Sequence, residues 1–311
     1  MKEEAELEHF TPQAVPPEVL AYGSTLAQLG VGKAGKLGAL VLRLERDKSN
    51  GKTSVKEQYS RVPLYTQRAL YLEEALPNMA YMYIISPSGG ILQGDRYRMD
   101  ITLRNHAFAH ITTQGATRLY RMERNYATQI INIDVGEDCY FEYIPDQMIP
   151  YRDSRFYQEA NLSVHDNATL LYSEIITPGR VASGEHFDYD VCYMKAIAKD
   201  SGGNLKFTDV ALLEPKKRDI GAFGILSGHE VIGNMYIITK KKVQEINLGV
   251  NDALKTFQKV YAGATVLPSD SGVGIRMLGN TASDLRYAIY EAVKVVRRVI
   301  LNAPFSGIRK G

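Results

Sequence analysis

The stretch Leu162-Ser163-Val164-His165-Asp166-Asn167-Ala168-Thr169-Leu170-Leu171-Tyr172 contains the pattern that decides the fold. An alternating apolar strand is followed by a polar turn, a small residue and a second apolar strand. The same order recurs at residues 101–107 and 133–139, so the unit returns about every 30 residues. Repeated strand pairs at this spacing indicate β units stacked around one shared core, as in a solenoid or an elongated stack of two sheets. An ordinary β-sandwich remains the alternative, because three degenerate copies could arise there by chance.

The strand pattern extends well beyond these copies. Between residues 81 and 215 apolar and polar residues alternate, as at Tyr97, Met99, Ile101 and Leu103. The chain has 20 tyrosines and no tryptophan, which also favours strands. We therefore expect a mainly-β protein, an elongated, β-solenoid-like stack of two β-sheets with few helices.

After Gly221 the strand alternation gives way to a mixture of strand and helical patterns, which predicts a small C-terminal α+β section. Strands are expected at 231–238 and 274–278, a short helix at 251–261, and the clearest helix of the chain at 281–301. Thr281 and Asp284 have the spacing of a capping box, and Pro304 forbids continuation. The apolar stripe of this helix predicts either a lid on the sheet core or a surface that docks a partner.

These patterns divide the chain into three parts. Residues 1–34 carry three prolines among acidic and small residues, and we expect an extension that is poorly ordered or lies along the surface. Residues 35–304 are expected to form a single mainly-β domain, whose helical section, about 250–304, faces a partner. Residues 305–311 form a C-terminal tail.

Composition excludes several classes of function. The 37 basic and 35 acidic residues nearly cancel, so no broad field attracts nucleic acid. No apolar run reaches the length of a membrane helix, and the acidic first residues do not resemble a signal peptide. The two cysteines, Cys139 and Cys192, suit buried thiols in a reducing compartment. We expect a cytoplasmic protein without membrane contact.

Two motif-like stretches do not support a nucleotide or a tight metal site. The run 30–36 has the spacing of a phosphate-binding loop, but Leu37 stands where Ser or Thr would hold Mg²⁺. His106 and His110 would chelate a metal on a helix, whereas on a strand they lie about 13 Å apart. The remaining histidines form no spaced pair, so no tight metal site is predicted.

Three carboxylates stand among apolar neighbours in predicted strands: Asp95, Glu174 and Asp209. Such groups either face solvent or are buried with a partner, because an unpaired buried carboxylate is costly. Arg155 and Arg180 are the natural partners for structural ion pairs. Gly89, Gly90 and Gly179 are expected to provide backbone angles that other residues resist, and two prolines bracket a stiff turn that holds Asp146.

Five polar and glycine-rich signatures lie between the predicted strands, and they include Gly94, Gly184 and Glu185. They are Gly89–Asp95, Thr112–Arg121, Tyr143–Pro150, Ser154–Phe156 and Gly179–Phe187. Each is weak alone, but the five in this order resemble the UreD (also called UreH) urease accessory proteins, from about residue 35 to about residue 304. The chain departs from that family in its longer N-terminal extension and in a tail that lacks tryptophan.

The resemblance implies a non-enzymatic urease maturation factor. Such a protein would bind a UreF-type accessory protein, through it recruit a UreG-type GTPase, and dock on apo-urease. The positions that match polar residues lining the family's internal passage for nickel are Asp95, Thr117, Glu174 and Asp209. Glu174 replaces the aspartate of some relatives. Nickel would be transient cargo rather than a tightly bound cofactor, which suits oxygen ligands.

Two alternatives remain open at this point. Three carboxylates on an elongated β stack could serve a polysaccharide-active enzyme, although the chain lacks the tryptophans that usually stack on sugars and has no secretion signal. The chain could also be a pure scaffold without a metal passage, in which the carboxylates are simply paired.

Overall fold

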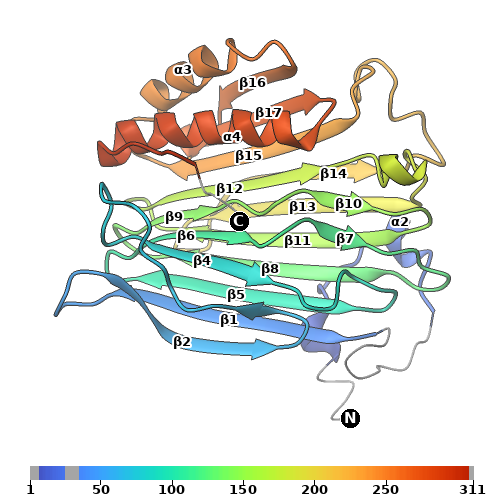
Figure 1. Cartoon of the computed structure of the whole chain (residues 1–311), viewed down its shortest axis with the longest axis horizontal. Coiled ribbons are helices and arrows are strands. Elements are labelled where there is room, and N and C mark those ends of the chain that lie inside the picture. The colour runs from blue at the N-terminus through green and yellow to red at the C-terminus, as the bar shows by residue number, and fades with distance from the viewer. Residues whose placement is uncertain (1–6, 25–34, 308–311) are drawn as a thin grey trace.

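The computed structural model describes residues 7–24 and 35–307, which form two large β-sheets and a helical layer (Figure 1). Sheet A has seven strands among the described residues. In spatial order they are β14 (Leu205–Leu213), β13 (Val191–Lys199), β11 (Arg155–Val164), β8 (Ala127–Val135), β5 (Arg96–Arg104), β1 (Leu37–Arg46) and β2 (Thr53–Arg61). The inner five pair in parallel, and β14 and β2 are antiparallel edges.

Sheet B lies against one face of sheet A. Its strands, in spatial order, are β16 (Val260–Val266), β17 (Gly272–Gly279), β15 (Val231–Thr239), β12 (Thr169–Ile176), β9 (Tyr140–Tyr143), β6 (Phe108–Thr113), β4 (Ala80–Ile85) and β3 (Tyr65–Thr66), with β10 (Met148–Pro150) and β7 (Thr117–Leu119) beside them. Strands β4, β6, β9 and β12 pair in parallel, whereas β15, β16 and β17 form an antiparallel extension.

The three sequence repeats are three turns of a solenoid, which confirms the predicted fold class. In each repeat the first strand belongs to sheet A and the second to sheet B. Ile101, Ile133 and Leu162 occupy the same position in the three copies, lie side by side in register on β5, β8 and β11, and are buried. The short polar turns use left-handed backbone at Asn105 and Asp138, which asparagine and aspartate tolerate. In-register apolar rungs therefore build the core between the sheets.

The long connections of the stack all lie at the opposite end of the strands from these turns. We call this end the loop end; its connections are residues 86–95, 114–126, 144–154, 177–190 and 214–230. They contain the short strands β7 and β10 and the 3-10 helix η1 (Val181–Ser183). The five sequence signatures thus meet at one end of the molecule, although they are spread over about a hundred residues.

A second hydrophobic core lies between the outer face of sheet B and two helices, α3 (Val243–Leu254) and α4 (Ala282–Val296) (Figure 1). Thr281 caps α4 as predicted: its hydroxyl accepts the Asp284 N–H at 3.1 Å. A π-helix, η3 (Arg297–Leu301), ends the helix. The buried face of α4 covers β12, β15 and β17, as a lid does.

The short helix expected at 251–261 was placed too late in the chain. Helix α3 begins at Val243 and ends at Leu254, and residues 260–266 form strand β16. Its buried positions Val243, Ile246, Val250 and Leu254 follow helical spacing, and that stripe begins earlier than expected. A 3-10 turn, η2 (Pro268–Asp270), then leads into β17.

Residues 7–24 lie along the outer face of sheet A. The short helix α2 (Pro17–Leu20) buries Val19 against Tyr157 and Val191 of the sheet. The rest of the predicted extension, residues 1–6 and 25–34, and residues 308–311 of the tail lie outside the described residues; Phe305 of the tail is buried in the second core. None of the described helices is long and apolar enough to span a membrane.

A buried ion cluster fastens the end of α4 to sheet B. The Arg297 guanidinium, fully buried, donates to both oxygens of Glu142 on β9, at 2.7 and 2.8 Å, and to Glu73 at 2.6 Å. Tyr140 and His110 also hydrogen-bond the Glu142 carboxylate. Burial raises the pKa of Glu142, but the charge and hydrogen bonds of Arg297 outweigh it and lower the pKa to about 2. The cluster therefore holds a fully ionised pair inside the second core.

We expect Arg297→Leu to lower the free energy of unfolding by about 3–5 kcal/mol, because it leaves buried carboxylates without their cation. The exposed neighbour Arg298 offers the matched control, and Arg298→Leu should change the free energy of unfolding by less than about 0.5 kcal/mol. Urea unfolding at pH 7 measures both. Equal stability of the two variants would contradict the fastening role of the cluster.

Candidate functional site

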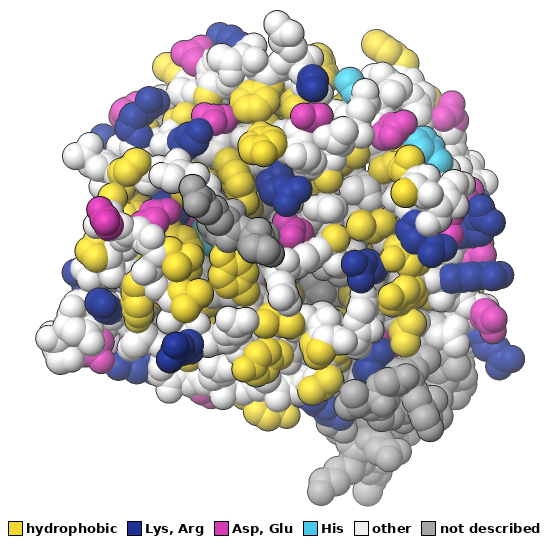
Figure 2. Space-filling model, in the orientation of Figure 1, with side chains coloured by type: hydrophobic (Ala, Val, Ile, Leu, Met, Phe, Trp, Pro, Cys, Tyr) yellow, Lys and Arg dark blue, Asp and Glu magenta, His cyan; other side chains and the backbone are white. Residues whose placement is uncertain are grey.

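A cavity of about 250 Å³ lies between the two sheets at the loop end. Its rim comes from three signature loops, which contribute Gly89 and Gly90, residues 113–118, and Asp146. Figure 2 shows a hollow near the middle of the corresponding face, beside β7, with hydrophobic side chains around it. Three of the five signatures recognised in the sequence therefore surround one concave site, which is where binding sites usually occur.

One wall of the cavity is a single rung of sheet A. Tyr97, Gln129, Gln158 and Met194 stand side by side in register on β5, β8, β11 and β13, and all four line the cavity. Deeper rungs of the same strands are apolar. The wall thus turns polar at this rung, while the next inward residues toward the loop end, Ala127, Phe156 and Cys192, are again apolar.

Glu174 on β12 is a buried carboxylate that lines the opposite wall of the cavity. Its Oε1 accepts hydrogen bonds from the Tyr172 hydroxyl at 2.7 Å and from Gln158 Nε2 at 2.8 Å. Burial raises the pKa of Glu174, and repulsion from Asp209 adds to this, while the hydrogen bonds from Tyr172, Gln158 and Asn234 oppose it. No described cation forms an ion pair with it, so a positive guest would relieve a real electrostatic cost.

The two glutamines connect this carboxylate to the opposite wall. Gln129 Nε2 donates to Gln158 Oε1 at 3.0 Å, and Gln158 Nε2 donates on to Glu174. Because all donors point toward Glu174, the chain of hydrogen bonds is polarised to support negative charge there. The carboxamide oxygens and the carboxylate together form a set of hard oxygen donors, which hold divalent cations loosely compared with thiolate or clustered imidazole.

Thr117 lines the cavity together with Glu174, but Asp95 and Asp209 do not. Asp95 is fully buried behind the wall, where Lys36 Nζ lies 2.9 Å from its Oδ2 and the Tyr97 hydroxyl donates to the same atom at 3.0 Å. Asp209 on β14 accepts hydrogen bonds from Tyr236 and Arg276. The structure therefore places Thr117 and Glu174 in the cavity lining. Asp95 and Asp209 lie outside the lining, where each binds neighbouring side chains.

Lys36 explains the misleading phosphate-loop spacing. It ends the run 30–36, whose first five residues lie outside the described part of the chain. Its ammonium and its backbone N–H both bind Asp95, the latter at 2.8 Å. The lysine is thus the cation of a buried pair that fastens the start of β1 to the loop before β5.

The glycines of the signatures serve the rim in two different ways. Gly89, Gly94 and Gly184 have positive φ of 78°, 74° and 74°, and Gly179 has 138°, where side chains are strained. Gly90 differs from the expectation, because its φ is not positive. A Cβ there would stand 2.6 Å from both the Arg118 carbonyl oxygen and the Tyr120 ring, so close packing requires this glycine.

Asp146 at the rim faces helix α4. Its Oδ1 lies 3.2 Å from Nη1 of Arg286, so an ion pair links the β9–β10 loop to the helical layer beside the cavity. The turn between Pro145 and Pro150 holds this carboxylate. The rim is therefore coupled to the second core as well as to the signature loops.

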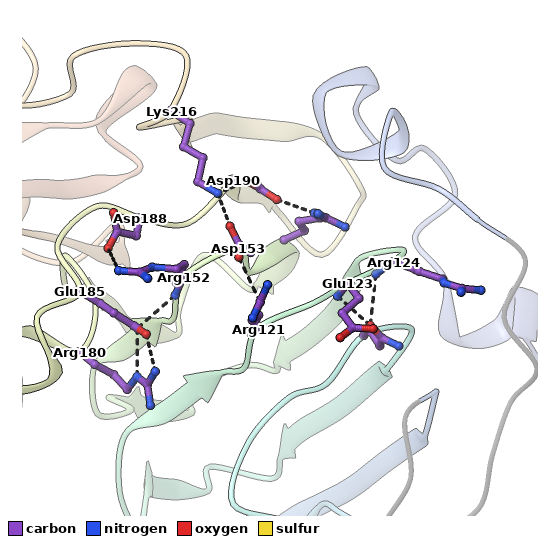
Figure 3. A network of polar contacts seen from close by, with 12 residues as sticks. Arg121, Glu123, Arg124, Arg152, Asp153, Arg180, Glu185, Asp188, Asp190 and Lys216 are labelled. Carbon is purple, nitrogen blue, oxygen red and sulfur yellow. Dashed lines mark hydrogen bonds and ion pairs between the residues drawn. The ribbon is translucent and has the colours of Figure 1, made fainter.

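Arg155 and Arg180 lie in ion pairs outside the cavity, in a polar network at the loop end (Figure 3). Arg155 Nε binds Asp190 at 2.6 Å, and Arg180 Nε binds Glu185 at 3.0 Å. Glu185 also accepts the Arg152 backbone N–H at 3.1 Å. These arginines join neighbouring loops to one another.

Sequence reasoning missed Gln129, Gln158 and the Arg297 cluster. Gln158 and Gln129 stand at positions where the alternation of their strands places inward-facing apolar residues. A polar residue at such a position was a signal that the sequence offered. Within the described residues, no three His, Cys, Asp or Glu side chains are grouped to hold a metal ion. The site is thus a cavity lined by scattered charged residues, Arg118, Asp146 and Glu174, rather than a preformed chelate.

Comparison with known proteins agrees with the signatures. The family described as UreD urease accessory protein matches residues 36–310. The urease accessory protein UreD of Cenarchaeum symbiosum is 40% identical over 286 residues, which cover 92% of this chain and 100% of that protein. UreD 2 of Brucella canis and UreD of Yersinia pseudotuberculosis are each 36% identical over 92% of this chain, and cover 95% and 89% of those proteins.

The rim packing gives a testable contrast between two glycines of the cavity. Gly90→Ala should lower the free energy of unfolding by about 1–3 kcal/mol, because the new methyl group meets backbone and ring atoms. Gly115→Ala, with nothing within 4 Å of its Cβ, should change it by less than about 0.5 kcal/mol. Chemical denaturation of both variants measures the difference, and equal losses would refute the packing role of Gly90.

The raised pKa of Glu174 gives a pH-dependent prediction. The fold favours the protonated form, so the contribution of this group to stability is present at low pH and is lost as the pH rises through its folded pKa. Glu174→Gln removes this dependence. We expect the stability of the variant relative to the wild type to grow between pH 5 and pH 8, by at most about 1.4 kcal/mol per pH unit. Thermal unfolding across this range measures it; a constant difference would show that Glu174 titrates normally.

Proposed function

Because the chain belongs to the UreD urease accessory protein family, we propose that it is a non-enzymatic urease maturation factor that conducts nickel to apo-urease. It would act in a complex with a UreF-type protein and, through it, a UreG-type GTPase. The observation that carries the proposal is the cavity itself: three of the five family signatures surround it, and Glu174, a buried carboxylate that pairs with no described cation, stands inside it.

Nickel in this proposal is cargo, and the cavity suits transient contact. A passage must release its ion, and a carboxylate with amide and hydroxyl oxygens binds Ni²⁺ more loosely than thiolate or paired imidazole would. Thr117, Gln129, Gln158 and Glu174 supply such oxygens around the same space. The ion would exchange part of its water shell for these groups and replace the missing positive charge beside Glu174.

Asp95 and Asp209 would contribute through the residues that they hold. Asp95 fixes the hydroxyl of Tyr97, which lines the cavity, and joins the strand start to the rim. Asp209 repels negative charge on Glu174 and so shifts its proton equilibrium. The alternative without a passage predicts that none of these groups affects nickel delivery.

We expect Glu174→Gln to reduce the nickel content of urease several-fold, because the buried carboxylate of the cavity that lacks a described cation is replaced by a neutral isostere. The measurement is the metal content and activity of urease purified after co-expression of its subunits and all accessory proteins with this variant. Asp252→Asn, on the exposed face of α3, is the matched control and should leave loading unchanged.

The same preparations separate a conduit from a pure scaffold. Nickel-poor urease together with intact accessory complexes would support conduction through the cavity. Full loading with Glu174→Gln would remove the passage from the proposal and leave a scaffold. Full loading when the whole chain is deleted would overturn the maturation role.

A further inference from the structure

The connection 214–230 presents an aromatic side chain that nothing in the described molecule covers. Phe223 at its tip is 97% exposed, and Ile225 beside it is also exposed. A phenylalanine that leaves nearly all of its surface in water gains no stability from its own fold. Such a residue is a candidate anchor for another molecule, since aromatic anchors carry much of the energy of protein interfaces.

The loop holds this side chain outward with an ordered backbone. Leu226 and Ile220 are buried and fix its base, while Leu226 N–H donates to the Ile220 carbonyl at 3.1 Å. Gly228 N–H donates to the Gly221 carbonyl at 3.0 Å and closes the loop. Two positive-φ glycines, Gly224 and Gly228, permit the reversal. The exposed position of Phe223 is thus built into the turn, which lowers the entropy lost on binding.

In the ion pairs around this loop the cation is exposed and the carboxylate is buried. Lys217 is 52% and Arg218 is 65% exposed, whereas their common partner Glu214 is 3% exposed. Arg180 is 43% exposed over Glu185 at 9%. The cations lie outside and the carboxylates beneath them, so an approaching molecule meets mainly positive groups although the pairs are balanced.

The neighbouring connections form one surface with this loop. His186 Nε2 lies 3.1 Å from Oε1 of Glu230, which joins connection 177–190 to connection 214–230. Lys216 bridges Asp190, at 2.7 Å, and Asp153 of a third connection, 144–154, and Arg121 approaches Asp153 from a fourth, 114–126 (Figure 3). The anchor and the outward cations are therefore held in a fixed relation, beside the end at which the cavity lies.

We propose that this surface, Phe223 with the outward cations Lys217, Arg218 and Arg180, docks an acidic protein surface that offers an apolar pocket for the phenylalanine. The proposal rests on the proposed function, because it assigns the partner to the maturation assembly. A protein fits better than a polyanion, since each cation already has a carboxylate beneath it and a single aromatic tip needs a pocket. Docking here would bring the partner to the loop end, where the nickel cavity lies.

The test uses the full chain and two purified probes, apo-urease and the UreF-type protein, each titrated separately by calorimetry. Phe223→Ser and the charge reversal Arg218→Glu should each weaken binding to one of the probes by about tenfold or more. Raising the salt concentration should weaken wild-type binding and reduce the difference in affinity between the wild type and Arg218→Glu. Leu248→Ser and Lys255→Glu on α3, also exposed, are the matched controls and should bind as the wild type does.

Each other outcome overturns the docking surface. Unchanged affinity of both loop variants for both probes would exclude it, while continued dependence of nickel loading on the chain would leave the proposed function intact. If the wild-type protein binds neither probe, and urease in cells acquires nickel without the chain, both the docking surface and the proposed function are overturned. Binding of the wild type to RNA or to phosphatidylserine vesicles that is lost in Phe223→Ser would reassign the surface to that class of ligand.

Discussion

In-register parallel pairing is the constraint on which the rest of the molecule depends. The side chains of Ile101, Ile133 and Leu162 form a buried rung that requires strands one repeat apart to run in the same direction. Parallel strands need a crossover, and here each crossover passes through the other sheet. In the three repeats the tight turns therefore fall at one end and the long connections at the other. The cavity and the ion-paired surface exist because that topology gathers the connections and keeps the sheet ends apart.

Two buried glutamates on sheet B have pKa shifts of opposite direction because their surroundings differ. Glu142 points to the helical layer and has Arg297 against both of its oxygens, so its pKa lies well below the ordinary value. Glu174 points between the sheets, where burial raises its pKa, and the neutral donors that it receives do not outweigh this burial. The first arrangement stabilises an interface between two layers. The second costs stability, and no described cation compensates it, which makes Glu174 a candidate functional group.

The sequence predicted the features that depend on local order. The repeat, the alternation of its strands and the cap at Thr281 are all carried by neighbouring residues, and the structure agrees with them. Contacts between distant residues could not be predicted in this way. Lys36 reaches Asp95 across 59 positions and Arg297 reaches Glu142 across 155, and only the assembled sheets show that these residues meet. The late placement of α3 has a local cause, since a helix of twelve residues carries too few apolar positions to fix its start.

The predicted passage residues show the same limit at the level of the site. Thr117 and Glu174 reach the cavity because their strand positions face inward at the polar rung, whereas Asp95 precedes its strand and turns toward Lys36. The strand alternation alone could show that Gln129 and Gln158 face inward, but only the register of β8 against β11 shows that they lie side by side. A conduit also needs weak, multiple oxygen contacts rather than a chelate, so it has no compact motif to recognise. The family patterns are distributed over loops that the topology brings together, and this explains why five weak patterns in a fixed order identified the family better than any single one.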